Sequence, residues 1–524
     1  MSSLKKSVSI EGRRCSHKNN GRNFRNMDQK NQLQIKRLIQ GAGTSDRLDL
    51  SEKQILTLNP QIADLANSLK VLHLQKNRIQ TLPSEIGCLR MLELLMLSEN
   101  HLTGLPESVA NLQNLKRLDL RHNKLDGDLP CVIYQLTSII QLFLNFNRIT
   151  KIHPGIANLS SLVNLDLSQN KLIQVPSEIG ELRHLSSFNL SHNNLSEVPE
   201  LLSNCVELTL LDLSHNQISK LPDQIGNLKK IKKIGLKYNQ LHSIPSSIAQ
   251  CVELEEFNIE NNNVEDIDSV VFEKCVELRQ ISIARNNFST LPKMANLSKL
   301  ISFDGSHNQI SLIPRGSFNQ PKLNWVCLKS NKICAIPDDV VNWKSMKELD
   351  LSSNNIMTIP DDLCNLATLE EFKISNNKLI ALPDTVGSLG ALKVLEADEN
   401  DIRSIPEDIG RCAALERLVL TTNHIEQLPT DIGHLKSLKF LLIGENRIYS
   451  VPPHIGMMDA LTELYINDNS ELHRLPMELS YCKSLQILSI EGCPLSEIPE
   501  NFLAGPSLVM QYLRYLVRNH CNDF

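Results

Sequence analysis

Eighteen asparagines recur along the chain at intervals of 22, 23 or 24 residues. These ladder asparagines are Asn77, Asn100, Asn123, Asn147, Asn170, Asn193, Asn216, Asn239, Asn262, Asn286, Asn308, Asn331, Asn354, Asn377, Asn400, Asn423, Asn446 and Asn469. Each lies in the frame L-x-x-L-x-L-x-x-N-x-L, as in Leu115, Leu118, Leu120, Asn123 and Leu125. A fixed period of this length predicts one elongated solenoid rather than several globular domains.

The frame is typical of leucine-rich repeats. It continues one unit past each end of the asparagine series, with Lys53 and Cys493 in the ladder position, which gives 20 repeats. The L-x-L piece predicts a short strand with its leucines inward, and the following L-P-x-x-I-G-x-L predicts an irregular outer crossover, where proline is tolerated. We therefore expect an α/β fold, a horseshoe-shaped leucine-rich repeat solenoid with a parallel sheet on its concave side and helical caps at both ends.

The composition of the ends predicts four parts. Residues 1–27 are basic and poor in apolar side chains, which favours a disordered arm. In residues 28–44, Leu33, Leu38 and Ile39 interrupt a polar run and suggest a capping helix. The solenoid is expected over 45–502, and residues 503–524 carry apolar side chains at helical spacing, which predicts a second cap.

Three repeats depart from the common length. One has an extra residue at 126–128, one lacks its proline at Ile267-Asp268, and one is short, between Asn286 and Asn308. Because the outer crossover sets local twist, we expect a change of curvature near residues 265–310.

Charge and hydropathy restrict the environment and partners. The net charge of −5 and pI of about 6.3 do not favour nucleic acid or an anionic membrane. No apolar run approaches the ~20 residues of a membrane helix, and no signal-peptide-like stretch opens the chain. We expect a cytoplasmic protein without direct membrane insertion. Five cysteines replace a crossover leucine and are predicted to be buried, unpaired thiols: Cys205, Cys251, Cys275, Cys412 and Cys482.

Variable residues between and after the strand leucines should line the concave face. The position between the two close leucines holds aspartate in six repeats: Asp49, Asp119, Asp166, Asp212, Asp304 and Asp350. The two positions before the ladder asparagine include Arg121, His122, Phe146, Lys237 and Tyr238. Phe146 and Tyr238 are open to two interpretations, ordinary surface scatter or anchors of a protein interface, where aromatic residues and arginine are enriched.

Charged residues gather in neighbouring repeats. A basic block at 229–237 precedes an acidic block at 253–260, and a second acidic zone lies at 370–399. These blocks either pair across strands, which stabilises little, or direct the choice of partner.

A catalytic site is not favoured. His122, His192, His215 and His307 recur because the repeat recurs, and no nucleophile, phosphate loop or metal-binding motif accompanies them. We expect no enzyme activity, no cofactor and no metal.

Several stretches resemble the Ras/Raf pathway scaffold family known as Shoc-two or Sur-eight. They are Leu118–Leu125, Phe146–Thr150, Glu178–Leu182 and Ser489–Leu495, and the similarity runs from about residue 28 to 518 with the same repeat number. The resemblance implies a non-enzymatic platform that binds a GTP-loaded Ras-type GTPase, typically M-Ras, together with the catalytic subunit of protein phosphatase one. The phosphatase then dephosphorylates Raf kinases, which are indirect substrates, and so promotes MAP kinase signalling.

In that family, strands of the N-terminal half contact the GTPase. The resemblance makes Asp119, Arg121, His122, Phe146, Lys237 and Tyr238 the GTPase-binding candidates. We expect charge reversal at Asp119 or Arg121 to weaken assembly while thermal stability stays near normal. Family members commonly have basic residues two places before the ladder asparagine, whereas this chain has Asn145 and Ser168 there.

The family also carries a phosphatase-docking motif, basic-x-Val-x-Phe, before the repeats. Here the candidate is Lys6, Val8 and Ile10, with isoleucine in place of the aromatic residue. A plain disordered arm remains the other interpretation. The same binding could bring the protein to the plasma membrane through the GTPase, and a nuclear pool stays open. The alternative function is a general leucine-rich repeat adaptor of the polarity or innate-immune type.

Overall fold

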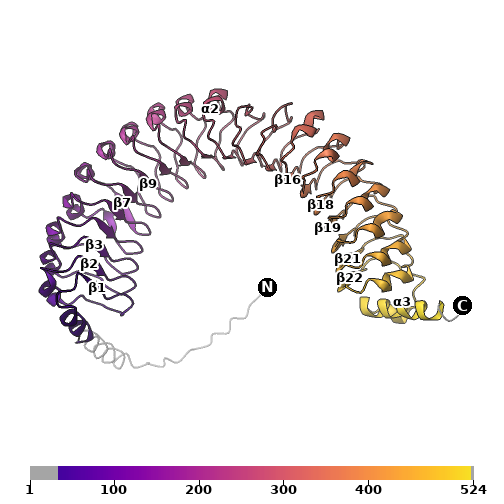
Figure 1. Ribbon diagram of the computed structural model, residues 1–524, viewed down its shortest axis with the longest axis horizontal. Helices are drawn as coiled ribbons and strands as arrows, with labels where there is room; N and C mark the ends of the chain where they lie inside the picture. The colour runs from indigo at the N-terminus through magenta and orange to yellow at the C-terminus, as the bar shows by residue number, and fades with distance from the viewer. Residues whose placement is uncertain (1–32, 521–524) are drawn as a thin grey trace, which may run out of the picture. The chain divides into compact units, whose positions relative to one another are not determined.

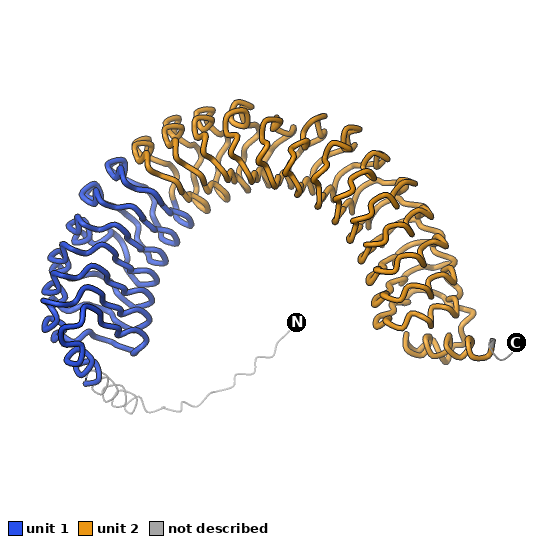
Figure 2. The backbone as a smooth tube through the Cα atoms, viewed as in Figure 1, with its two compact units in different colours: residues 1–194 blue, residues 195–524 orange. Residues whose placement is uncertain are grey.

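The computed structural model describes residues 33–520. The basic arm and the docking candidates Lys6, Val8 and Ile10 therefore lie outside the described residues. The chain divides into two compact units, with the boundary between Asn194 and Leu195 (Figure 2). Each unit is described by itself.

One coil is repeated throughout both units. A three-residue strand is followed by a turn at the ladder asparagine and by a short 3-10 helix, and in each unit the strands lie on the inner edge and the helices on the outer edge (Figure 1). The leucines of the frame are buried, as Leu118 and Leu120 show with no exposed area. Proline usually precedes the helix, as Pro83 does with φ of −71°, because its fixed backbone angle suits that position.

The main sheet of the first unit contains seven parallel strands in chain order. They are β1 (Arg47–Asp49), β2 (Val71–His73), β3 (Leu94–Met96), β4 (Arg117–Asp119), β6 (Gln141–Phe143), β8 (Asn164–Asp166) and β9 (Ser187–Asn189). The outer helices are η1 (Pro60–Leu65), η2 (Ser84–Cys88), η3 (Glu107–Asn111), η4 (Cys131–Gln135), η5 (Pro154–Asn158) and η6 (Ser177–Glu181).

The extra residue of the first unit has a structural role. Strand β5 (Asp126–Asp128) pairs in parallel with β7 (Arg148–Lys151), and the register shifts between Gly127 and Asp128. This shift is a β-bulge, which accommodates one additional residue without disturbing the main sheet.

The N-terminal helix buries a different set of residues from those that the sequence suggested. Residues 33–42 are helical. Ile35 and Ile39 are 2% and 1% exposed, whereas Leu33 and Leu38 are 54% and 37% exposed. Ile35 and Ile39 are four residues apart and share one helix face, so the buried face is theirs.

The second unit contains thirteen parallel strands. They are β10 (Leu210–Asp212), β11 (Lys233–Gly235), β12 (Glu256–Asn258), β13 (Gln280–Ser282), β14 (Ser302–Asp304), β15 (Trp325–Cys327), β16 (Glu348–Asp350), β17 (Glu371–Lys373), β18 (Val394–Glu396), β19 (Arg417–Val419), β20 (Phe440–Leu442), β21 (Glu463–Tyr465) and β22 (Ile487–Ser489). With the seven strands of the first unit they make 20, which confirms the leucine-rich repeat solenoid and its repeat number.

Short helices and α2 form the outer side of the second unit, and α3 lies at its C-terminal end (Figure 1). They are η7 (Glu200–Asn204), η8 (Asp223–Asn227), η9 (Ser246–Gln250), α2 (Ser269–Lys274), η10 (Asp338–Asn342), η11 (Asp361–Asn365), η12 (Val386–Ser388), η13 (Glu407–Arg411), η14 (Thr430–His434), η15 (Pro453–Met457), η16 (Met477–Tyr481), η17 (Glu500–Phe502) and α3 (Pro506–His520). Val509 and Leu513 of α3 are buried.

The irregular repeats of the second unit change the crossover but not the sheet. The repeat that lacks its proline forms α2, whose N-cap Asp268 accepts a hydrogen bond from the Val270 N–H. Residues 283–324, all of them described, form no regular helix. Strand pairing nevertheless continues in register from β12 to β15. The expected change of curvature stays a prediction.

Aromatic side chains fill the core where the short helices are missing. Phe318 packs against Phe303 and Trp343, with ring centroids 5.6 and 5.3 Å apart. All three are nearly or fully buried. Large rings thus occupy the volume that a helix supplies elsewhere.

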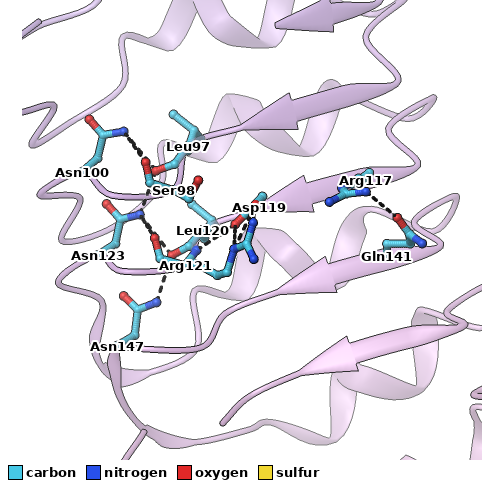
Figure 3. A network of polar contacts seen from close by, with 10 residues as sticks. All are labelled: Leu97, Ser98, Asn100, Arg117, Asp119, Leu120, Arg121, Asn123, Gln141 and Asn147. Carbon is cyan, nitrogen blue, oxygen red and sulfur yellow. Dashed lines mark hydrogen bonds and ion pairs between the residues drawn. The ribbon is translucent and has the colours of Figure 1, made fainter. Parts of the chain in front are cut away.

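The ladder asparagine joins successive coils (Figure 3). Asn123 Nδ2 donates to the carbonyls of Leu97, one coil earlier, and Leu120, at 2.9 and 3.0 Å, and its Oδ1 accepts from the Leu102 N–H at 2.9 Å. The amide group therefore satisfies buried backbone groups that the turn leaves unpaired.

The five crossover cysteines are buried, as predicted, and among residues 33–520 their thiols form no disulfide. Burial raises the pKa of the Cys205, Cys251 and Cys412 thiols to about 12. Within residues 33–520, no helix has the length and apolar character needed to cross a membrane.

Candidate protein-binding faces

The residue immediately before each ladder asparagine, here called the pre-ladder residue, has an unusual backbone conformation. All eighteen pre-ladder residues have positive φ, between 50° and 57°. They are Lys76, Glu99, His122, Phe146, Gln169, His192, His215, Tyr238, Asn261, Arg285, His307, Ser330, Ser353, Asn376, Glu399, Thr422, Glu445 and Asp468. Since coils within a unit repeat at the strand spacing of roughly 4.8 Å, side chains in this column can stack flat on one another.

Two aromatic stacks use this spacing, one in each unit. His122 and Phe146 have ring centroids 4.0 Å apart and an interplanar angle of 11°. His215 and Tyr238 are 4.3 Å apart at 8°. Phe146 remains 44% exposed and Tyr238 37%, so each stack holds a large apolar ring at the surface.

The inter-leucine aspartates have a structural role that the sequence did not reveal. In all six, Oδ1 accepts a hydrogen bond from the N–H two residues on, at 2.9–3.1 Å. Asn189 makes the same bond to the Ser191 N–H. Short polar side chains commonly form such local turns. The recurrence of aspartate at this position is therefore explained by the local turn and not by a binding partner.

Asp119 differs from the expected surface residue because its side chain has no exposed area. Its carboxylate accepts from Arg121 Nε at 3.0 Å and Nη2 at 2.7 Å. This hydrogen bond, opposed by partial burial, raises the pKa of Arg121. Asp119 thus fixes the direction of the Arg121 guanidinium, and Arg121, 39% exposed, is the one that faces solvent.

Phe143 and Arg117 belong to the same cluster but were missed in the sequence analysis. The carbons at the centres of the Arg117 and Arg121 guanidinium groups lie 4.9 and 5.6 Å from the Phe143 ring centroid, within cation–π range. Arg117 Nη1 donates to Gln141 Oε1 at 3.2 Å (Figure 3). One sequence signal could have identified Phe143. It lies between the two close leucines of its repeat, a position that holds aspartate in six other repeats.

Two positions carry basic residues in the family that the sequence resembles. In this chain they hold buried side chains. Asn145 and Ser168 are 8% and 6% exposed. Asn145 Oδ1 is buried without a hydrogen-bond partner among the described residues, and Ser168 Oγ donates to Asp166 Oδ1 at 2.7 Å. Positive charge at this face therefore comes from Arg117 and Arg121.

In the second unit, most of the basic block is paired. Lys230 bonds Glu207 at 2.7 Å, Lys232 bonds Glu255 at 3.3 Å, and Lys233 bonds Glu256 at 2.6 Å. All of these lysines are about half exposed, so the pairs stabilise by only about 0–1 kcal/mol.

Lys237 makes no ion pair with any residue in 33–520, unlike Lys230, Lys232 and Lys233. Beside it, the Tyr238 hydroxyl donates to Glu260 at 3.4 Å. Lys237 and Tyr238 are the candidates of the second unit.

The structure thus forms two candidate faces, one in each unit. The unit-1 face consists of Arg117, Arg121, His122, Phe143 and Phe146, with Asp119 beneath it. The unit-2 face consists of His215, Lys237 and Tyr238. Among residues 33–520, no cluster of side chains is suited to hold a metal ion. Exposed aromatic groups at both faces, together with arginine at the unit-1 face, favour protein binding.

Comparison with known proteins gives the same fold. A family model described as leucine rich repeat matches residues 90–149, 137–195 and 321–379, and a related one matches 207–228. The solved plant peptide hormone receptor RGFR1, in complex with RGF2, is 28% identical with a TM-score of 0.71, covering 85% of this chain and 78% of the receptor. A leucine-rich repeat protein of Leptospira interrogans, LIC12759, is 28% identical with a TM-score of 0.58, covering 79% and 93%.

The curated relatives are similar over a short stretch. A leucine-rich repeat protein soc-2 homolog of Nematostella vectensis is 63% identical over 49 residues, 9% of this chain and 8% of the relative. The SHOC-2 protein of Danio rerio is 53% identical over 49 residues, 9% of each chain. The aligned stretch therefore spans less than a tenth of these relatives' length.

Proposed function

We propose that this leucine-rich repeat protein is a non-enzymatic scaffold of the SHOC-2 type, which binds a GTP-loaded Ras-type GTPase and the catalytic subunit of protein phosphatase one. The stretch similar to soc-2 and SHOC-2 proteins carries this proposal. The assembled phosphatase would remove phosphate from Raf, and the scaffold itself would break no bond. The scaffold would act in the cytoplasm.

The unit-1 face supports GTPase binding through its geometry. Asp119 holds Arg121 in one direction, which lowers the conformational entropy lost when a partner binds. Among residues 33–520, Arg117 donates to the Gln141 side-chain oxygen and forms no ion pair with a carboxylate, so its charge is available to an acidic side chain of a partner. The exposed Phe146 ring, stacked on His122, offers an anchor of the kind that dominates interface energetics.

The unit-2 face supplies a second contact of similar chemistry. Among residues 33–520, Lys237 forms no ion pair, unlike Lys230, Lys232 and Lys233, and Tyr238 is held flat by His215. The segment around Lys6, Val8 and Ile10 would bind the phosphatase by adding an extended strand to it.

A pull-down with nucleotide control tests the proposal. The immobilised protein is mixed with GTP-loaded or GDP-loaded M-Ras and the phosphatase catalytic subunit. We expect capture of both partners with the GTP form and of little GTPase with the GDP form. Equal capture with both nucleotides would favour the general adaptor instead.

Point variants separate GTPase binding from phosphatase docking. We expect Phe146→Ala to weaken GTPase binding about tenfold, the effect of about 1.4 kcal/mol at an interface anchor. Ile173→Ala, which also truncates an exposed apolar residue (60% exposed), is the matched control and should bind normally. Val8→Ala with Ile10→Ala should reduce phosphatase capture alone. Unchanged phosphatase affinity in that double variant would remove the docking motif from the proposal.

A further inference from the structure

One flank of the second unit carries an exposed apolar stripe. In each coil the chain crosses this flank on its way from the inner strand to the outer crossover. In four consecutive coils the third and fourth residues after the ladder asparagine are exposed there: Ser311-Leu312, Cys334-Ala335, Met357-Thr358 and Ile380-Ala381. Leu312, Met357 and Ile380 are 60%, 56% and 52% exposed. We call Leu312, Cys334, Met357 and Ile380 the flank stripe.

The flank stripe is a local feature and is not required by the repeat. The residues that fill the core lie beside it in the chain, as Ile333 and Ile336 do on either side of Cys334. In the five preceding coils of the unit the same two positions are polar: Ser196-Glu197, Ser219-Lys220, His242-Ser243, Glu265-Asp266 and Ser289-Thr290. A contiguous apolar surface of this kind on an otherwise polar edge typically marks a protein interface.

Two rows of polar residues border the flank stripe. The inner row, next to the strands, is the residue that follows each ladder asparagine, and the outer row is the residue that follows each crossover proline. From the first coil to the fourth, the inner row is Gln309, Lys332, Asn355 and Lys378, and the outer row is Arg315, Asp338, Asp361 and Asp384. All of these residues are exposed except Asn355, which is half-buried.

The two rows make the flank complementary to a second copy of itself. A two-fold axis that runs along the flank stripe sets each coil opposite the same coil of the second copy. It also reverses inside and outside, so the outer row of one copy meets the inner row of the other. Asp338 then faces Lys332 of the second copy, and Asp384 faces Lys378 of the second copy. The apolar side chains of the two stripes meet between the rows.

We infer that the flank stripe is the interface of a homodimer with this parallel, two-fold arrangement. An isologous interface requires a patch that is complementary to itself, and the opposite charges of the two rows satisfy this requirement coil by coil. Among residues 33–520, Asp384 and Lys378 make no ion pair, unlike Lys373 and Lys393, so both charges are available to the second copy.

The other two-fold arrangement is less complementary. An axis across the flank stripe sets the first coil opposite the fourth and each row opposite itself. Asp338 would then face Asp361 of the second copy, and both lysines would face neutral side chains. Only Asp384 would meet a cation, Arg315. Like charges opposed across an interface disfavour it, so the charges select the parallel arrangement.

The dimer is independent of the proposed signalling partners. The flank stripe lies on the side of the second unit, whereas Lys237 and Tyr238 belong to the coil of β11 and follow its strand. A failed dimer test would therefore leave the proposed function unaffected.

Sedimentation velocity of the full chain at increasing concentration tests the inference. Four coils extend only about 15 Å at the strand spacing, so we expect a weak dimer with a dissociation constant of about 50 µM. Met357→Glu places a carboxylate at the centre of the stripe in both copies and should weaken dimerisation more than about tenfold. Ile173→Glu is the matched control, because Ile173 is equally exposed at the same repeat position in the first unit, and it should dimerise normally. A chain that stays monomeric, or a dimer that Met357→Glu leaves intact, would overturn the inference.

A charge exchange tests the arrangement of the two copies. Asp384→Lys alone sets two lysines against each other and should weaken the dimer about fivefold to tenfold. Adding Lys378→Glu to the same chain restores opposite charges in both copies, so the double variant should dimerise nearly as well as the wild type. A double variant as weak as Asp384→Lys would contradict the parallel arrangement, since only that arrangement brings these two positions together.

Cross-linking at Cys334 gives a second measurement of the arrangement. Cys334 is exposed, and the parallel axis places it opposite Cys334 of the second copy. Copper(II)-phenanthroline should take two electrons from the two thiols, which lose their protons and form one disulfide between the copies. We expect a reducible dimer on electrophoresis that Cys334→Ser abolishes, although the exposed Cys88 and Cys131 remain. An unchanged yield of cross-linked dimer in Cys334→Ser would contradict the arrangement.

Discussion

The amide of a ladder asparagine acts on two coils at once, because its nitrogen donates to backbone carbonyls of its own and the preceding coil and its oxygen accepts from an N–H of the preceding coil. Asn123 illustrates this with bonds to Leu97, Leu102 and Leu120. An aspartate would lose the donor and a leucine would lose both functions. This explains why the same residue type stands at eighteen positions, and it is the part of the fold that the sequence most directly predicted.

Removing one ladder amide should therefore cost more than an ordinary surface substitution. We expect Asn123→Ala to lower stability by about 2–4 kcal/mol, because it leaves buried backbone groups unpaired. Asn111→Ala, at an exposed position, is the control and should change stability by less than about 0.5 kcal/mol. Urea unfolding followed by circular dichroism measures both. Equal midpoints for the two variants would contradict this role of the ladder asparagine.

Asp119 marks the limit of what could be predicted at this scale. Sequence position placed it on the surface, but its burial depends on where the Arg121 side chain lies, and no spacing rule gives that. The hydrogen bond from the Arg121 N–H to Asp119 and the similar bonds of the other aspartates depend on turn geometry. The expectation that charge reversal at Asp119 would spare thermal stability is therefore incompatible with its environment.

Charge reversal at Asp119 should instead lower the melting temperature. Asp119→Lys would place a cation at a buried position beside Arg121, so it should destabilise the protein by about 3 kcal/mol or more. Asp119→Asn keeps the Oδ1 acceptor, as Asn189 shows with Ser191, and should melt near the wild-type temperature. Scanning calorimetry of the two variants distinguishes them. Normal melting of Asp119→Lys would show that this side chain is free to turn outward.

At the scale of elements, the crossovers were predictable where they keep the consensus. Proline preceding a short helix and the buried cysteines both followed from the repeat. Helix α2 did not, because the sequence signal at 267–268 was a missing proline, and what replaces it depends on the capping bond of Asp268. The packing of Phe318 on Trp343 also depends on contacts between neighbouring coils.

The crossover cysteines give a test of burial through their pH dependence. Because burial raises the pKa of Cys205 to about 12, the folded thiol stays neutral at pH 8, where we expect iodoacetamide to modify the exposed Cys88, Cys131 and Cys334 and spare Cys205. Mass spectrometry of the labelled peptides measures this. Rapid native labelling of Cys205 would contradict its burial.

The same shift predicts how stability changes with pH. The raised pKa means that Cys205 stabilises the folded state fully below its ordinary pKa of 9.0, and that this stabilisation is lost as pH rises toward about 12. Cys205→Ala removes the titrating group. The difference in urea midpoint between wild type and Cys205→Ala should therefore shrink above pH 9, and a constant difference would contradict the assignment.

At the scale of the whole molecule, a solenoid is stabilised by contacts between neighbouring coils. A local change should then affect mainly the coils next to it. Helix α3 offers the clearest case because it contacts η16 and η17. Deleting it removes the burial of Val509 and Leu513, worth about 1.5–3 kcal/mol each, and uncovers the apolar end of the last coil.

We therefore expect a chain that stops at Gly505 to lose order locally. Hydrogen exchange should become faster over residues 477–489, which contain η16 and β22, and stay unchanged over residues 33–194. The control is Tyr515→Ala, which alters an exposed position of α3 (58% exposed) and should leave exchange unchanged in both regions. Faster exchange throughout 33–194 in the shortened chain would mean that the molecule unfolds as one cooperative body, since an effect limited to neighbours could not reach so many coils.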